Sequence, residues 1–355
     1  MNFYIFVLIL LLLTALFNTN KMMDQKDHSI TNKSNVICLC LGGVCIFLLM
    51  ALKQPLTGDY GRYGTHFRNI MFKSLDGKTI LLSEPGFFLL NRLIRSITDK
   101  TFYFFAITSS FICYSVGRYI YNNADNKKYG LYFYYCIGLF AFSMAGLRQT
   151  LAMSICLFSY SAIKDRKLLR FLIIIAFAFL FHKSAIFFMP AYFIATIKWK
   201  FTSILGAITL YSILILLFDS IYTFISRWLD YDYGIESTGN GVIFLFILLA
   251  ISTLTIICRK KLLEIDGNNI IFINLHFAVL ALWIFRLFTR TVERPSFFYL
   301  YASIILLDKI LSIPPVRDKD KTTRKFLVVA ALLFFAILFI YRLFRDGNLL
   351  PYIII

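Results

Sequence analysis

Apolar runs separated by short polar turns dominate this chain from one end to the other. Each run is typical of a helical segment, and together they cover 2–17, 36–52, 102–120, 129–146, 149–163, 171–181, 186–197, 201–218, 241–258, 270–285, 296–312 and 326–341. A helix needs about 20 residues to cross a bilayer, so several runs are short. The pattern predicts an all-α, polytopic transmembrane protein of about twelve segments, some of them short or re-entrant.

The two shortest runs, 171–181 and 186–197, flank His182 and allow two interpretations. They form either one helix of about 40 Å or two short segments that return the chain to the same side. The positive-inside rule favours the second, with both termini outside. The second interpretation places the later basic stretches in the cytoplasm: Lys164–Arg170, Lys198–Lys200, Arg259–Lys261 and Arg317–Lys325.

Composition supports a membrane protein, because 59% of the residues are hydrophobic, more than a soluble domain can bury. We expect a single integral membrane domain over 1–355, an outer loop at 53–101 that contains an interfacial helix, and a second outer loop at 219–240. The net charge of +18 fits basic loops beside an anionic leaflet better than nucleic-acid binding, for which no motif is present. None of the seven cysteines has C-x-x-C spacing, so we interpret them as small hydrophobes.

Arg148 and His182 stand out, because each lies where two apolar segments meet. An ionisable group at bilayer depth costs about 2.5–3.5 kcal/mol, so it requires a water-filled cavity or a partner. A guanidinium suits phosphate or carboxylate, and an imidazole suits proton transfer. The alternatives are a snorkelling arginine and a structural histidine. In the predicted topology both lie outside with the other unusual polar residues, which indicates one extracytoplasmic cavity.

Two motifs in the first outer loop carry further candidates. In Gly58–Tyr63, the rings of Tyr60 and Tyr63 suit sugar faces, while Asp59 and Arg62 either pair or bind ligand; an ordinary turn is the alternative. Glu84 precedes an apolar stretch with arginines at helical spacing, which is typical of an interfacial helix with an acid near its start; an anchoring helix with snorkelling arginines is the alternative.

A late basic cluster contains Arg286, Arg290 and Arg294 at i, i+4 and i+8, so a helix would place them on one stripe able to hold a pyrophosphate. A basic cap with Glu293 as its counter-charge is the alternative. Asp230-Tyr231-Asp232 is a D-x-D triplet, the pattern with which some sugar-nucleotide transferases hold a metal ion, but the predicted topology places it outside the cell, where sugar nucleotides are not expected. No P-loop, dinucleotide, zinc-protease or nucleophile-elbow motif occurs.

The order of G-D-Y-x-x-Y, Glu84, L-R-Q-x-L-A at Leu147–Ala152, F-H-K-S-A at Phe181–Ala185 and the late arginines resembles the EpsG family of Wzy-like polymerases. The resemblance implies a glycosyltransferase that polymerises undecaprenyl-pyrophosphate-linked repeat units of O-antigen, capsule or exopolysaccharide at the outer face of the bacterial cytoplasmic membrane. It maps the family's motifs onto Asp59, Arg148, His182 and Arg286–Arg294. A chain-length regulator is an expected partner by resemblance.

The chemistry agrees with these residues. The donor is already activated, so we expect no cofactor and no metal, and inversion needs one base, with His182, Asp59 and Glu84 as candidates. Arginines stabilise the departing pyrophosphate. A flippase for the same lipids, a lipid-A-core or wall ligase of the O-antigen ligase type, and an O-acyltransferase are the alternatives.

Overall fold

The computed structural model describes residues 2–21, 28–54, 58–73, 84–229, 241–315, 318–345, 349–350 and 352–354. Within these ranges every regular element is a helix, and the only β pairing is an isolated antiparallel bridge between Lys53 and Ile354. The prediction of an all-α protein is therefore confirmed. The chain packs as two compact units, Met1–Ile186 with Ile304–Ile355, and Phe187–Ser303.

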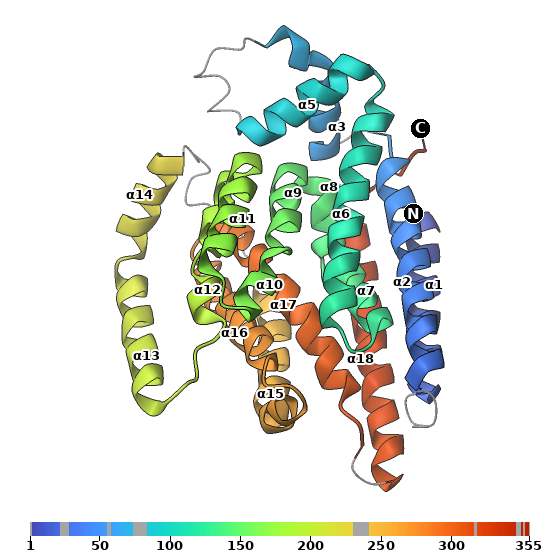
Figure 1. Ribbon diagram of the computed structural model, residues 1–355, viewed down its shortest axis with the longest axis vertical. Helices are drawn as coiled ribbons and strands as arrows, with labels where there is room; N and C mark the ends of the chain where they lie inside the picture. Colours follow the sequence, from blue (N-terminus) through green and yellow to red (C-terminus); the bar gives the residue numbers. More distant parts are fainter. Residues whose placement is uncertain are drawn as a thin grey trace. The chain divides into compact units, whose positions relative to one another are not determined.

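The first unit contains most of the helices drawn in blue and green in Figure 1, together with a long C-terminal helix drawn in orange-red. They are α1 (Asn2–Lys21), α2 (His28–Ala51), α3 (Gly58–Asn69), η1 (Ile70–Phe72), α5 (Pro85–Ile97), α6 (Thr101–Asn123), α7 (Lys127–Cys136), α8 (Leu139–Ala145), α9 (Leu147–Cys156), α10 (Ser159–Lys164), α11 (Leu168–Phe181) and α18 (Asp318–Arg345). Helices α1, α2, α6 and α7 pack side by side, and α9 packs against α11.

The second unit contains most of the elements between Phe187 and Ser303. They are α12 (Ala191–Ile194), α13 (Phe201–Leu216), α14 (Phe218–Leu229), α15 (Val242–Ile265), α16 (Asn269–Phe285) and η3 (Arg290–Val292). Two elements cross the unit boundary along the chain, η2 (Lys183–Phe188) and α17 (Glu293–Ser312).

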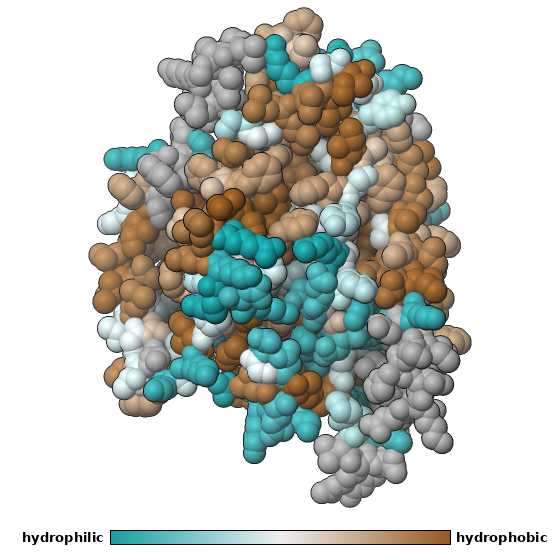
Figure 2. All heavy atoms as spheres, in the orientation of Figure 1, coloured by the Kyte–Doolittle hydropathy of each residue, from teal (hydrophilic) through white to brown (hydrophobic). Residues whose placement is uncertain are grey.

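Every predicted apolar run contains helix, but the helices differ in length. Within the part of the chain that the structure describes, four are long and apolar enough to span a bilayer: Lys33–Ala51, Val242–Ile265, Arg290–Ser312 and Asp320–Arg345. A fifth candidate is the pair Ile204–Leu216 and Phe218–Phe224, bent by 70°. Apolar side chains cover much of the face in Figure 2, as expected for a protein that exposes its helices to lipid. The protein is a helical membrane protein, and the count of about twelve segments stays a prediction.

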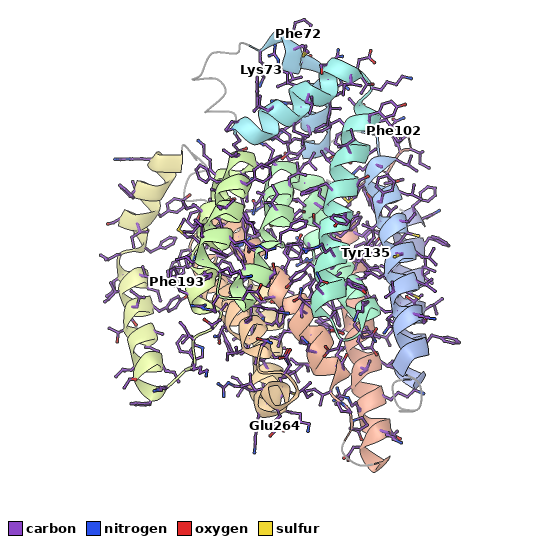
Figure 3. The ribbon with its side chains drawn as sticks, viewed as in Figure 1. Phe72, Lys73, Phe102, Tyr135, Phe193 and Glu264 are labelled. Carbon is purple, nitrogen blue, oxygen red and sulfur yellow. The ribbon has the colours of Figure 1, made fainter. Side chains whose placement is uncertain are left out.

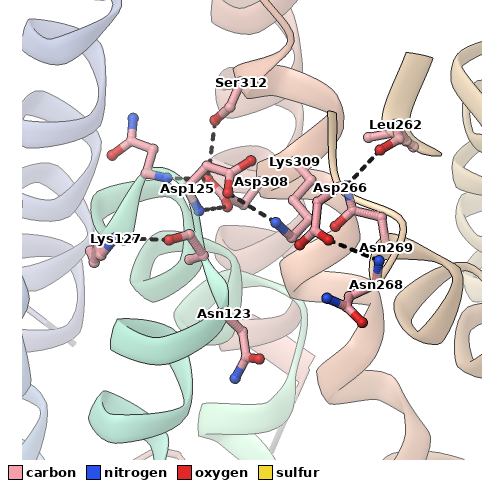
Figure 4. A network of polar contacts seen from close by, with 12 residues as sticks. Asn123, Asp125, Lys127, Leu262, Asp266, Asn268, Asn269, Asp308, Lys309 and Ser312 are labelled. Atoms are coloured by element: carbon pink, nitrogen blue, oxygen red, sulfur yellow. Dashed lines mark hydrogen bonds and ion pairs between the residues drawn. The ribbon is translucent and has the colours of Figure 1, made fainter. Parts of the chain in front are cut away.

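Polar contacts fix two of the turns between helices (Figure 4). In the first unit, the Asp308 carboxylate accepts the backbone N–H groups of Asp125 at 2.7 Å and Asn126 at 2.9 Å, next to the start of α7. Lys309 Nζ donates to Asp125 at 2.9 Å. In the second unit, Asn269 donates to the Leu262 carbonyl at 2.8 Å, near the end of α15. Helix ends carry unpaired backbone groups, and these side chains satisfy them.

The outer loop predicted at 53–101 contains α3, η1 and α5, which lie together at one end of the first unit (Figure 1). Helix α5 is amphipathic: Phe87, Phe88, Asn91 and Ile94 are buried on one face. The predicted helix in this loop therefore exists, and its position at the membrane interface remains a prediction. In the second predicted loop, 219–229 belong to α14, while 230–240 lie outside the described residues.

Candidate active site

The Glu84 side chain contacts both Arg148 and His182, the two residues that the sequence pattern predicts as site residues. Its Oε1 lies 2.5 Å from His182 Nδ1, and its Oε2 accepts a hydrogen bond of 2.9 Å from Arg148 Nη1. The backbone N–H of Lys183 also donates to Oε1, at 3.2 Å. One buried carboxylate therefore connects the start of α5, the start of α9 and the end of α11.

The sequence Glu84-Pro85-Gly86 explains how the carboxylate reaches this position. Glu84 precedes α5 with φ +63°, a left-handed conformation that is uncommon outside glycine, and its side chain makes no capping bond to α5. Pro85 begins the helix, where its missing N–H costs nothing. At Gly86 a Cβ would lie 3.0 Å from three atoms of Leu180. The absence of that Cβ lets α5 start directly against the last turn of α11.

His182 lies at the predicted break, which is confirmed. Helix α11 ends at Phe181, and His182 has an extended backbone (φ −160°, ψ 125°) before η2 begins. Its side chain is buried, 5% exposed. Because an ionised carboxylate only accepts hydrogen bonds, Nδ1 donates to Glu84, and Nε2 of the neutral ring carries the lone pair that a base requires.

Arg148 is more accessible than its partner. Its side chain is 41% exposed, whereas that of Glu84 is 5% exposed. The helix breaks at Gly146, so Arg148 lies in the first turn of α9. Its guanidinium also lies over the Phe87 ring, with Cζ 5.9 Å from the centroid. A partly exposed guanidinium fixed on one edge by a carboxylate is suited to bind an anion with its remaining donors.

Electrostatics keeps Glu84 ionised. Burial by itself would raise the pKa of this carboxyl. The hydrogen bond from His182, the electrostatic interactions with His182 and Arg148, and the Lys183 N–H together outweigh burial and hold the pKa of Glu84 below its usual value. At neutral pH the site therefore contains a carboxylate between two cationic or proton-donating groups.

Side chains of helix α3 pack against Phe87, beside the Glu84, Arg148 and His182 site. Tyr63 packs edge-on against Phe87 with centroids 6.0 Å apart, and His66 lies 5.8 Å from the same ring. The Arg148 charge acts on both Tyr63 and His66. The sequence pattern predicts Tyr63 as a candidate but not His66, because a loop in this segment would give the two side chains no common face. The three-residue spacing of the two side chains, which places them on one face of a helix, is the signal that would have found it.

The remaining candidates of the first loop, Asp59, Arg62 and Tyr60, make contacts other than those with Glu84, Arg148 and His182. Asp59 Oδ1 pairs with Arg62 Nη1 at 3.2 Å, and both are exposed, at 40% and 84%. The expectation that Tyr60 stacks on a sugar is wrong for this structure. Its ring is 1% exposed and stacks on Phe105 at 4.1 Å, while its hydroxyl donates to the Met50 carbonyl. Tyr60 therefore anchors α3 to α2 and α6.

The late arginines do not form the predicted stripe. Arg286 follows the end of α16, Arg290 begins η3 and Arg294 lies in α17, so no single helix carries all three. Arg286 Nε donates to Glu293 at 3.1 Å, and its side chain is 7% exposed. The counter-charge interpretation of Glu293 is therefore correct for Arg286. These contacts belong to the second unit.

The D-x-D triplet Asp230–Asp232 lies outside the described residues. Among the residues that the structure does describe, no group of three or more His, Cys, Asp or Glu side chains is arranged to hold a metal ion.

Comparison with known proteins identifies the chain at the level of family. The model of the EpsG family matches residues 36–354, nearly the whole chain. No curated protein and no solved structure matches it. The matched region contains all of the Glu84, Arg148 and His182 site. The chain therefore belongs to the EpsG family, a family of Wzy-like polysaccharide polymerases.

Proposed function

We propose that this protein polymerises oligosaccharide repeat units carried on undecaprenyl pyrophosphate, by glycosyl transfer at the outer face of the bacterial cytoplasmic membrane. The family supports a polysaccharide polymerase. The observation that supports this chemistry is the Glu84 carboxylate shared between His182 and Arg148. It gives one centre a proton acceptor and an anion-binding group, the two functions that transfer from a pyrophosphate donor requires.

The transfer is a single displacement. His182 Nε2 takes the proton of an acceptor hydroxyl, and the hydroxyl oxygen forms a bond to the anomeric carbon of the donor sugar. The bond from that carbon to the pyrophosphate oxygen breaks, and its electron pair stays on the pyrophosphate. Attack from the face opposite the leaving group inverts the anomeric centre, and no covalent intermediate or metal is needed.

Each residue has a separate role in this step. Glu84 fixes the His182 ring and stabilises the imidazolium that forms, as a carboxylate does in a catalytic triad. Arg148 binds the pyrophosphate, on which negative charge develops. Glu84 itself is a poor base, because its two oxygens already contact His182 and Arg148 and its pKa is lowered. Asp59 pairs with Arg62, so we assign proton removal to His182.

The other candidate substrate ligands are consistent with roles outside the reacting centre. Tyr63 packs against Phe87 beside Arg148 and is suited to contact a sugar. We keep exposed Arg62 and the arginines Arg290 and Arg294 as ligands of donor or acceptor. Arg286, held by Glu293, is suited to support the segment that carries them.

Reconstitution tests the proposal. Purified protein in proteoliposomes receives one defined undecaprenyl-pyrophosphate-linked repeat unit, and products are sized on a gel. We expect a ladder from the wild type and from Arg170→Ala, a matched control in which an exposed arginine near the start of α11 is removed. His182→Ala should slow extension by about 10²–10⁴-fold, the usual contribution of a general base. Arg148→Ala should also leave mainly single units.

The outcomes separate the function from the assignment of residues. A wild-type protein that inserts normally but never extends the repeat unit would contradict a polymerase. Wild-type chain lengths from His182→Ala would instead remove His182 as the base. In cells, deletion of the gene should leave surface glycans with a single repeat, whereas loss of a flippase would leave none.

A further inference from the structure

A second imidazole lies beside the site and has no role in the transfer step described above. His66 is on α3, and its ring centroid lies 5.8 Å from that of Phe87. The Arg148 guanidinium contacts the same Phe87 ring, with Cζ 5.9 Å from its centroid. Phe87 follows Glu84 by three residues, so the ring that His66 contacts belongs to the first turn of the helix that begins beside the carboxylate.

A buried amide, that of Asn91, also interacts with His66. Asn91 is completely buried, and its Nδ2 donates to the Phe87 carbonyl at 2.7 Å, which fixes the amide. Its side chain interacts with the imidazole and favours the protonated ring. Yet His66 Nδ1 and Asn91 Oδ1, both buried, make no hydrogen bond of normal geometry to any described residue. Buried polar atoms are nearly always paired, so the Asn91 amide and the His66 imidazole are each other's remaining partners, and the amide orients the ring.

The charges around His66 indicate which kind of ligand it accepts. Burial and the positive charges of Lys73 and Arg148 lower the pKa of His66 to about 4. A neutral imidazole carries one donor and one acceptor, so it pairs with a hydroxyl, which is also both. It offers no charge to a phosphate. The pyrophosphate therefore belongs to Arg148, and a sugar hydroxyl suits His66.

We propose that His66 binds a hydroxyl group of the sugar substrate, and that Asn91 acts as its positioning residue. The inference rests on the proposed polymerase function. The half-buried ring of His66 contacts the ligand, and the buried amide of Asn91 orients that ring. The site then consists of two oriented imidazoles, one held by a carboxylate for proton transfer and one held by an amide for recognition.

Kinetics in the same proteoliposomes test this assignment. His66→Phe keeps an aromatic ring against Phe87 but removes both nitrogen atoms. His66→Gln restores a neutral acceptor and donor. Asn69→Ala is the matched control, because Asn69 is exposed at the end of the same helix and its side chain makes no capping bond. All variants are compared by size-exclusion chromatography first, so that loss of folding is separated from loss of binding.

We expect His66→Phe to raise KM for the lipid-linked repeat unit by about tenfold, the scale of one lost hydrogen bond, with kcat within about threefold of the wild type. His66→Gln should recover most of the loss, and Asn69→Ala should match the wild type. An unchanged KM in His66→Phe, or a fall in kcat alone, would overturn the assignment while leaving the polymerase intact. An inactive wild type would instead refute the proposed function.

Discussion

Glu84 Oε1 and His182 Nδ1 lie 2.5 Å apart although 98 residues separate them along the chain. The carboxylate is almost completely buried and also contacts Arg148. Removing one member of a buried charged group leaves the others unpaired at a large free-energy cost. The three residues should therefore respond to mutation as a unit, with effects that are not additive.

Glu84→Gln preserves the shape of the side chain and removes its charge. Gln cannot stabilise an imidazolium at His182, and its amide can force the wrong tautomer of the ring. We expect the initial rate of extension to fall by about 10³-fold, with KM little changed, because the lost interaction strengthens in the transition state.

Glu264→Gln is the control for this measurement. Glu264 pairs with Lys261 at 3.7 Å, and both side chains are about half exposed, so its neutralisation should have no measurable effect. A Glu84→Gln protein that extends the repeat unit as fast as the control would show that the carboxylate does not support His182.

Gly86→Ala should inactivate the protein without touching substrate. The added Cβ would lie 3.0 Å from the carbonyl carbon, the oxygen and the Cβ of Leu180, all in or next to rigid backbone. Helix α5 must then move away from α11, and Glu84 moves away from His182. We expect at least a tenfold loss of kcat, since small displacements of catalytic groups cost about 10²-fold.

Gly117→Ala is the matched control, because a Cβ at Gly117, in α6, would meet nothing within 4 Å. This variant should be as active as the wild type and slightly more stable, since Ala favours helix over Gly by about 1 kcal/mol. Equal activity in the two variants would mean that contact between α5 and α11 does not set the site geometry.

The sequence predicted those features that depend on local pattern. Apolar runs become helices, and the break at His182 occurs where the short runs meet. The expectation that Arg148 and His182 lie in one place is met by a shared contact with Glu84. That Glu84 is this contact could not be predicted, because its partners lie 64 and 98 residues away and depend on how α5 packs on α11.

The failures also have physical causes. Tyr60 and Tyr63 look equivalent in a Gly-rich segment, but once that segment is helical they point to different faces, and Tyr60 enters the core. The arginine stripe assumed one continuous helix through Arg286 and Arg294. The chain instead ends α16 at Phe285, and Glu293 neutralises the buried Arg286.

Acidification should destabilise the folded protein in two steps. The pKa of His66 is lowered from 6.5 to about 4, so between these values the unfolded chain binds a proton that the folded protein does not. The stability that the neutral His66 imidazole contributes to the folded protein is complete above pH 6.5 and is lost as pH falls towards 4. The pKa of Glu84 is also lowered, so its contribution is lost only below about pH 4.5.

Thermal unfolding of the detergent-solubilised protein between pH 7.5 and 4.5 checks this order. The wild type and Glu84→Gln should both lose Tm steadily across that interval, whereas His66→Phe should lose less. If His66→Phe and the wild type have parallel profiles, the imidazole is not held neutral by its surroundings.

An exposed apolar stripe on α5, away from its buried face, should lie among lipid chains. Leu89, Leu93 and Ile97 repeat every four residues and are 55%, 63% and 80% exposed. Phe72, which is labelled in Figure 3 at the end of η1, is 88% exposed. An exposed apolar stripe on an amphipathic helix is typical of a membrane interface. Seating α5 there would hold Glu84 close to the depth of lipid headgroups, where the pyrophosphate of a lipid-linked sugar lies.

Lipids brominated in their acyl chains quench only tryptophans that reach them, so they test this position. In liposomes of such lipids, the added fluorescence of Phe72→Trp, measured against the wild type with its three native tryptophans, should be strongly quenched. Arg68→Trp, one turn earlier on α3 and also exposed, should be quenched much less. Equal quenching at both positions would contradict an interfacial α5, because the two residues would then lie at one depth. Strong quenching at position 72 alone would instead place the end of η1, which packs against α5, among the acyl chains.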